Sequence, residues 1–591
     1  EARCPLSSDD NRGAKGALLA RDYECDATSL HLPRREAQVR KTIGPGPSGW
    51  TDWKEALWTL NYLQVMHNAK EGPVKKVPAQ QLAAVGVPGN VTQGSPTPGV
   101  YLGSSRIEGF QAGAFIEMLD DQAAQWLRAL TTGDGKRLGG FPTVGAALRY
   151  GPPSPPRWFP AAIAVGEKAD GSGFPRPASY TIAAPESRLL DLAGLLGAYA
   201  SAYALTDRAN AQVGGSQPVE AYFDGDPFPA QDQTPRGRPT LHDRALAMIR
   251  VAVVDIARLH VDPRSGLPAD EARVSGGKPA RGPTLSAEVA AYTLLALRTA
   301  RRALDAQLTL YADTTPDTHG IPTPLDGFPR LDGLAFGARL DQLIDALARA
   351  FYDRFTTPAG VAFAGLDVAT GTPTDAGAAL DAHTAAVRGL FVAYLATGAI
   401  RFRERAAAVL ARLEAAFYDP RARVYRATAG DRSPTVTFTP RRFGLLQAAL
   451  RDGYELLARQ PGRAPLAALL EARLGRLDKL VLNGWDDRDG DELVEWPSEC
   501  ANLGAGPDGL PMGRGGLQMA ERTLSGDTGA VPSAVPEGGA RAVADREHDC
   551  VPEIAAVGLP SALAASVTFA LVPWSPANEG QLFRNGAWVA R

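Results

Sequence analysis

The feature that most constrains this 591-residue chain is a phrase that recurs where long apolar runs end. Three runs close on an aspartate that enters a turn rich in Gly, Pro or Arg, namely His-Val-Asp262-Pro-Arg, Phe-Tyr-Asp353-Arg-Phe and Phe-Tyr-Asp419-Pro-Arg. A looser copy ends at Asp487, and the last three copies are almost evenly spaced. Repetition at a near-constant period predicts a fold assembled from one recurring structural unit.

The runs between these junctions have the 3.6-residue periodicity of helices. Helices are expected over 186–210, 240–260, 285–308, 335–354, 375–397, 400–418, 439–459 and 464–482, after two earlier ones at 53–67 and 107–130. Only Gly398-Ala399 separates the apolar run 375–397 from the charged run 400–418, whereas a much longer segment follows Asp419. The short connection requires an antiparallel pair, and the difference in polarity predicts an inner and an outer layer.

The helix-to-hairpin junctions and alternating loop lengths resemble the α/α-toroids of six-hairpin glycosidases, polysaccharide lyases and sugar epimerases. The resemblance covers 185–575 and implies a mainly α fold, in which antiparallel helix pairs form an incomplete or closed α/α-toroid with long Gly/Pro-rich loop excursions. Residues 1–184 are expected to form an N-terminal arm, two helices and an irregular excursion packed on the main domain. Residues 185–591 are expected to form the toroid, with a long loop insertion at 483–550.

The cysteines bear on the compartment. Cys4 with Cys25 and Cys500 with Cys550 are predicted to form two local disulfides, with buried free thiols as the alternative. A chain that begins at Glu1 is typical of a protein after signal-peptide removal. Both features predict a secreted, periplasmic or cell-surface protein.

Composition and the absence of certain motifs argue against several classes of function. The net charge of −3 indicates no basic footprint for nucleic acid. No haem-attachment or nucleotide-binding motif occurs, so neither cofactor is expected. The uncharged stretch 554–574 is interrupted by glycine and proline, which predicts a buried helix over 561–571 and no transmembrane span.

Helix starts supply the first candidate site residues. If the inner helices begin at the long-loop face, their N-termini converge there and attract anions. Asp381 and His383 are the catalytic candidates on this face, and Arg441, Arg442 and Glu288 the substrate-binding ones. Paired arginines bind carboxylate or phosphate groups, which favours a glycan or another acidic ligand. The same logic includes Glu186, Arg188, His242 and Asp243, and the alternative is that all these residues cap helices and pair with each other.

The junction at Asp487 carries extra carboxylates. Asp487, Asp489, Asp491, the Leu493 carbonyl and Glu495 place oxygens at alternate positions, as in the first half of a calcium-binding EF-hand loop. Glu492 and Ser498 depart from that motif, which leaves a looser calcium loop, a solvated acidic turn, or Asp487 and Glu495 as catalytic acid and base. Trp485 and Trp496, like Trp50, Trp53 and Trp58, are expected either to stack on sugar rings or to lie in the core.

Two functions remain in competition. One is a secreted or periplasmic carbohydrate-active protein of the hydrolase or lyase type, with its site at the long-loop face of the toroid. The other is a non-catalytic extracellular scaffold or partner subunit of a larger assembly, which docks a protein partner through 70–184 and 483–550.

Overall fold

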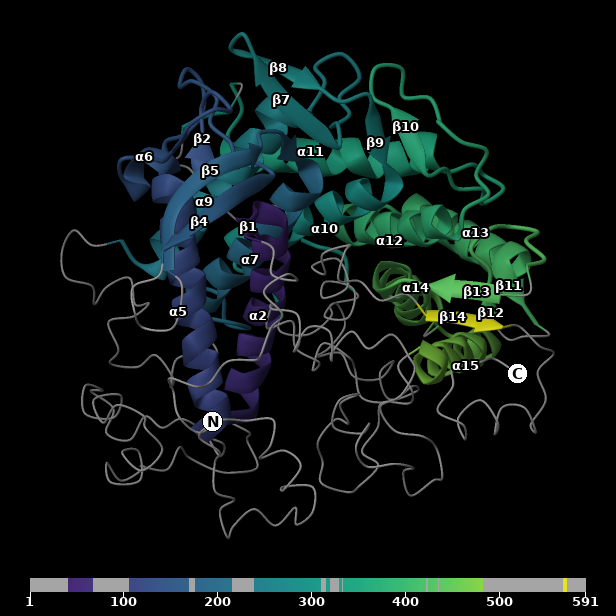
Figure 1. Cartoon of the computed structure of the whole chain (residues 1–591). Helices are drawn as coiled ribbons and strands as arrows, with labels where there is room; N and C mark the ends of the chain where they lie inside the picture. Colours follow the sequence, from purple (N-terminus) through teal and green to yellow (C-terminus); the bar gives the residue numbers. More distant parts are fainter. Residues whose placement is uncertain are drawn as a thin grey trace. The chain divides into compact units, whose positions relative to one another are not determined.

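The structure is a computed structural model in which the fold is mainly α (Figure 1). It describes residues 41–66, 106–168, 176–214, 239–309, 315–318, 329–331, 333–420, 424–433, 435–458, 460–481 and 567–570. The chain divides into two compact units. The first comprises 41–377 and 388–406, and the second holds 378–387 and the residues from 407 onward.

The first unit contains three successive helix pairs. They are α2 (Pro45–Met66) with α5 (Arg106–Ala129), α7 (Leu189–Thr206) with α9 (Leu241–Asp255), and α10 (Ala287–Leu304) with α11 (Phe336–Ala350). One π-helical turn extends each of α9 and α11, namely η3 (Ile256–His260) and η4 (Phe351–Phe355). Figure 1 shows α2 and α5 running side by side. The predicted helices 107–130, 240–260 and 335–354 are therefore confirmed, whereas the first helix begins eight residues earlier than expected.

Helix α7 lies at the centre of this unit, in contact with α2, α9 and α10. All of its residues except Leu190 and Asp191 are buried, which follows from its almost wholly apolar and small side chains. A Cβ atom at Gly194 or Gly197 would collide with the rings of Trp50 and Trp53, so these glycines let α2 approach closely. By length and composition α7 alone among the described helices would also suit a membrane span, but 89% of it is buried by packing.

A recurring backbone hydrogen bond ties the starts of three helices to hairpins. The first N–H groups of α7, α10 and α12 (Leu380–Thr397) donate to the carbonyl oxygens of Asp270 (2.8 Å), Ala364 (2.8 Å) and Ala427 (2.9 Å). Each acceptor lies beyond one of the repeated junctions, at Asp262, Asp353 and Asp419 respectively. At these three junctions the sequence repeat corresponds to a structural repeat, in which the chain turns back and caps the start of an earlier helix.

Asp270 also joins two helix starts within the first unit. Its N–H donates to the Thr284 carbonyl oxygen (2.9 Å), and its Oδ1 accepts from the N–H of Ser286 (3.0 Å), just before α10. Because α7 and α10 start together at Asp270 and pack along their lengths, they run parallel. Trp50 and Tyr292, each early in α2 and α10, are also in contact.

The segment 133–184 differs from the expected irregular excursion. It forms β4 (Ala162–Lys168) and β5 (Arg176–Ala184), which pair with each other and, through β4, with β1 (Thr42–Ile43). The smaller elements of this unit are β2 (Thr131–Thr132), β3 (Leu138–Gly139), α6 (Val144–Leu148), β6 (Ser187–Arg188), β7 (Glu271–Ser275), β8 (Lys278–Arg281), β9 (Thr284–Ser286) and β10 (Gly365–Asp367). Tyr150, Trp158 and Phe159 are 1–3% exposed, so large aromatic side chains anchor this segment in the core.

The second unit contains α14 (Pro440–Gly453), its π-helical extension η5 (Tyr454–Ala458) and α15 (Ala464–Val481), packed as a pair. Helices α12 and α13 (Ile400–Phe417) pass across the division between the units, and β11 (Tyr418–Asp419) forms a hairpin with β12 (Val424–Tyr425). The prediction of a helix over 561–571 is wrong where the structure describes it. Val567–Ala570 is strand β14, because β13 (Thr435–Phe438) offers it an antiparallel partner.

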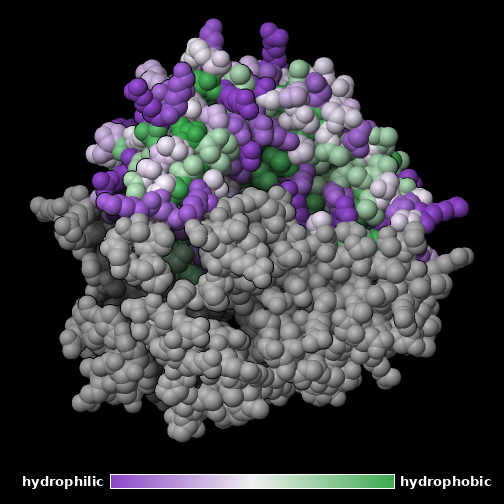
Figure 2. Space-filling view, in the orientation of Figure 1, coloured by the Kyte–Doolittle hydropathy of each residue, from purple (hydrophilic) through white to green (hydrophobic). Residues whose placement is uncertain are grey.

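The described surface is mixed in polarity. Figure 2 shows hydrophilic and hydrophobic residues interleaved over the face it presents. Met118, Tyr180, Leu334 and Ile400 are the large hydrophobic side chains that are exposed among the described residues, and they lie on different elements.

Candidate functional site

Among the described residues, the most deeply buried run of charged side chains lies on α2. Asp52 and Lys54 are 0% exposed and Glu55 is 1% exposed. These three side chains lie on a helix that packs against both α5 and α7. Burial of ionised groups is expensive unless their surroundings compensate, which makes this run the first place to look for chemistry.

Aromatic rings flank the buried charges. Trp50 and Trp53 stack on each other with ring centroids 5.3 Å apart, and Trp50 meets Tyr292 edge-on at 5.3 Å. The Nε1–H of Trp50 donates to the Leu190 carbonyl oxygen at 3.2 Å. Both tryptophans are 2–3% exposed, so of the two roles expected for them the core role is correct.

Some polar atoms in this part of α2 have no hydrogen-bond partner. The Tyr199 hydroxyl lies 3.3 Å from Asp52 Oδ2 and donates to it. Asp52 Oδ1, Glu55 Oε2 and Thr59 Oγ1 are buried without a hydrogen-bond partner. These positions are three and four residues apart, so the three oxygens follow one side of the helix. An unpaired buried polar atom costs roughly 1–3 kcal/mol.

Burial brings the pKa values of two neighbouring groups to the same range. Burial raises the pKa of Glu55 to about 7, against the opposing effect of Lys54. Burial also lowers the pKa of Lys54 to about 7. The pKa of Asp52 is raised well above its ordinary value, first by burial and then by the negative charge of Glu55. Groups poised near neutral pH can both give and take protons, which is what general acid–base catalysis requires.

The sequence contained a signal for this cluster that points to catalysis only in retrospect. Gly49-Trp-Thr-Asp52-Trp-Lys-Glu55-Ala-Leu-Trp58 combines two carboxylates at helical spacing with three tryptophans. Sequence reasoning considered only the tryptophans, because an acidic residue near the start of a helix is ordinarily solvated. Gly194 and Gly197 let α7 approach the rings of Trp50 and Trp53, and Tyr199 of α7 donates to Asp52.

Among the residues predicted from the sequence, Asp381 and Arg442 are brought together. Arg442 Nε and Nη2 donate to Asp381 Oδ1 and Oδ2 at 2.8 and 2.9 Å, a bidentate pair joining the first turns of α12 and α14. The hydrogen bonds to Asp381 raise the pKa of Arg442. The convergence of these two helix starts was expected, and the pairing corresponds to the alternative in which such residues satisfy each other.

The other predicted helix-start residues have no hydrogen bond to that pair among the contacts that the structure gives. His383 is 0% exposed, its Nδ1 is 2.9 Å from the Ala379 carbonyl oxygen, and its ring packs on Phe417 at 4.7 Å. Glu288 is partly buried in the first turn of α10, and Arg441 is exposed in that of α14.

The remaining helix-start residues have structural partners. Asp243 completes a capping box with Thr240 at the start of α9, and His242 lies against Thr206 at 3.1 Å. Glu186 accepts a hydrogen bond from Arg188 at 2.9 Å. Capping and pairing therefore account for the contacts of these three side chains.

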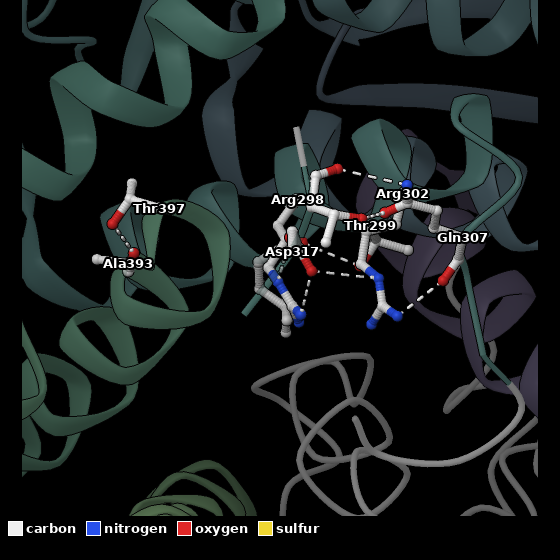
Figure 3. Close-up of polar contacts among 9 residues, drawn as sticks. Arg298, Thr299, Arg302, Gln307, Asp317, Ala393 and Thr397 are labelled. Carbon is white, nitrogen blue, oxygen red and sulfur yellow. Dashed lines mark hydrogen bonds and ion pairs between the residues drawn. The ribbon is translucent and has the colours of Figure 1, made fainter. Parts of the chain in front are cut away.

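A second buried polar cluster lies on α10 (Figure 3). Arg298 binds Asp317 through Nε and Nη2 at 2.9 and 2.7 Å, and Arg302 Nε approaches the same carboxylate at 3.4 Å. Arg302 also donates to the Gln307 carbonyl oxygen at 2.7 Å. The Asp317 carboxylate thus binds two arginines of α10 and holds the segment around it against this helix.

Several predicted residues lie outside the described part of the chain. They are the acidic loop Asp487, Asp489, Asp491, Leu493 and Glu495, the tryptophans Trp485 and Trp496, and the cysteines Cys4, Cys25, Cys500 and Cys550. Within the described ranges, no three His, Cys, Asp or Glu side chains gather closely enough to hold a metal ion. Calcium binding and both disulfides stay predictions.

Comparison with known proteins gives distant structural similarities. No protein-family model and no curated protein matches the chain. Among solved structures, a D-mannose isomerase has 10% sequence identity and a TM-score of 0.36 over 78% of this chain and 79% of its own. A sugar epimerase from a ruminal bacterium has 11% identity and a TM-score of 0.29, covering 55% of this chain and 63% of its own. These scores are too low to support an argument about the fold. The pairing of the helices is therefore based on the contacts described above.

Proposed function

We propose that the protein is a carbohydrate-active enzyme of the hydrolase or lyase type, built on an α/α-toroid, with its reactive groups on α2. The observation that carries the proposal is the row of buried, unpartnered oxygens at Asp52, Glu55 and Thr59. A sugar offers many hydroxyl donors, and two carboxylates are the usual machinery for cleaving a glycosidic bond.

The geometry of α2 suits that role. Side chains three residues apart on a helix have Cβ atoms about 5–6 Å apart, and the catalytic carboxyl groups of glycosidases are about 5–10 Å apart. Glu55, with its pKa near 7, is assigned the proton donor, because it is protonated over much of the neutral range. Asp52, to which the Tyr199 hydroxyl donates, is assigned the second carboxyl group, and it must lose its proton to act as nucleophile or base against a pKa that burial raises.

The toroid is proposed from the helix pairs. The parallel course of α7 and α10 and the recurring cap on each inner helix support a ring of inner helices whose starts share one face. In that arrangement α2 would be the inner helix that precedes α7. The chain is also proposed to be secreted or periplasmic, as its cysteines suggest.

A panel of neutral and acidic polysaccharides tests the proposal, with reducing-end release for hydrolysis and absorbance at the unsaturated product for lysis. Glu55→Gln should lower turnover about 100-fold or more, since general acid–base catalysis contributes that much. Glu404→Gln, an exposed carboxylate on α13, is the matched control and should leave turnover unchanged. Absence of turnover and binding across the panel, or full activity in Glu55→Gln, would refute the proposal.

The same experiment addresses the competing function of a non-catalytic scaffold. The side chains of Asp52 and Glu55 are almost fully enclosed, which is the observation that favours a purely structural network. A scaffold would bind no glycan, and native material would be recovered as part of a larger assembly. A soluble monomer with glycan turnover would exclude it.

A further inference from the structure

A pocket of about 270 Å³ lies on the first unit, away from every residue of the α2 cluster. Its lining comes from one side of α11 and η4 and from the hairpin that follows η3. The α11 side contributes Arg339, Gln342 and Arg349, and η4 contributes Asp353 and Arg354. The repeated helix-to-aspartate junction thus forms one wall, and the preceding copy of the junction forms the other.

The charges of the pocket are unbalanced. Three arginines face one aspartate in the lining, a net excess of two positive charges. Arg349 and Arg354 have no acidic partner within the described residues, and neither does Asp353. Another residue of α11 does form an ion pair, because Asp341 binds Arg301 at 2.6 Å.

The guanidinium group of Arg354 is held in place. A Cβ atom at Gly371 would collide with its Nη1, which means that the turn at Gly371 packs directly against the group. Arg339 is fixed from the other side by a hydrogen bond of 2.5 Å from its Nη1 to Gln342 Oε1. A cation that is already oriented loses less entropy when it binds an anion.

The rest of the lining is aliphatic. Val261 and Leu267 from the hairpin face Leu343, Ala346 and Ala350 from α11. A cavity of about 150 Å³ admits benzene, and pockets for drug-sized ligands begin near 300 Å³. The volume therefore fits a ligand the size of one sugar or aromatic ring.

We propose that this pocket is a binding site for a small organic anion, in which a carboxylate or phosphate group is bound by Arg349 and Arg354 and a compact ring packs on Leu343 and Leu267. Guanidinium groups form bidentate hydrogen bonds with both kinds of anion, which is why the two share one chemistry. Asp353 opposes binding by repulsion and sets its strength. The site is independent of the α2 cluster and of the function proposed for it.

Isothermal titration calorimetry of the full chain at low ionic strength tests the site with three probes of one size, glucose 6-phosphate, glucuronate and glucose. Binding of at least one anion and none of glucose is expected, and which anion binds identifies the group. Arg354→Gln should weaken binding about 10-fold, and Asp353→Asn should strengthen it about 5-fold. Arg412→Gln, which removes an exposed charge on α13, is the control and should change nothing.

The opposite signs of the two variants protect the test from misfolding, because a damaged protein does not bind more tightly. Failure of both anions to bind would overturn the proposal. Binding of glucose as strong as that of the anions, or equal losses in Arg354→Gln and Arg412→Gln, would also overturn it.

Discussion

Replacing Glu55 by glutamine should change the stability of the protein in a way that depends on pH. The pKa of this carboxyl group is raised from its ordinary value of 4.5 to about 7 in the folded chain. Between these two values the folded state binds the proton that the unfolded state releases. Wild-type stability therefore falls as the pH rises from 4.5 to 7, and below 4.5 the group has no such effect.

The size of the effect follows from the shift. Each pKa unit corresponds to about 1.4 kcal/mol, so a shift of this size contributes up to about 3 kcal/mol. Glutamine does not titrate, and it keeps the shape of the side chain. The free energy of unfolding of Glu55→Gln, relative to wild type, should increase by up to about 3 kcal/mol between pH 4.5 and pH 8.

Urea denaturation at pH 4.5, 6, 7 and 8 measures this difference, with tryptophan fluorescence as the signal because Trp50 and Trp53 lie beside Glu55. Lys54 acts in the opposite sense above pH 7, since its lowered pKa makes the folded state release a proton first. The Glu55 charge raises the pKa of Lys54, so Glu55→Gln also favours the neutral lysine, and this acts in the same direction as the predicted difference. A stability difference that stays constant with pH, or that falls as the pH rises, would show that Glu55 is not enclosed as described.

Three further predictions concern packing, an ion pair and metal binding. Gly197→Ala should lower the free energy of unfolding by about 1–3 kcal/mol, because its methyl group would overlap the Trp53 ring. Gly133→Ala, which has room for the same methyl group, should leave the urea midpoint almost unchanged. A double-mutant cycle across Asp381 and Arg442 should give a coupling of about 1 kcal/mol or less, because the Asp381 side chain is 45% exposed, and several kcal/mol would contradict this. If the loop 487–495 binds calcium, a chelator should lower the melting temperature, and an identical melting curve with and without chelator would rule that out.

The helices were predictable where periodicity and capping agree. Thr240 and Thr439 cap α9 and α14 as their positions before each run suggested, and Pro440 occupies the first turn of α14. The apolar segment 561–571 was mistaken for a helix because periodicity cannot separate a short buried strand from a buried helix. The strand β14 exists through its pairing with β13, which is more than a hundred residues away in the chain.

The candidate site was less predictable, for a physical reason. The sequence singles out charged residues by their position at helix starts. In the structure, some of these residues pair with each other, as Asp381 does with Arg442. The α2 cluster is unusual because it is buried, and α7 approaches this helix through two glycines that are close to it only in three dimensions. Depth of burial, rather than residue type, is what separates Glu55 from an ordinary helix carboxylate.

The three described copies of the repeated aspartate show how one architectural position takes on different tasks. Asp262 Oδ1 accepts the N–H groups of Arg264 and Ser265 at 2.8 and 3.0 Å and so shapes its hairpin. Asp419 binds Arg426 at 2.6 Å and closes the next strand onto its own. Asp353 does neither, and its hairpin still returns to cap α10, so the fold does not need that carboxylate. Among the described residues, Asp353 makes no hydrogen bond that the fold requires, and it lies in a pocket with two unpaired arginines. This copy of the repeat is therefore the one for which we propose ligand binding.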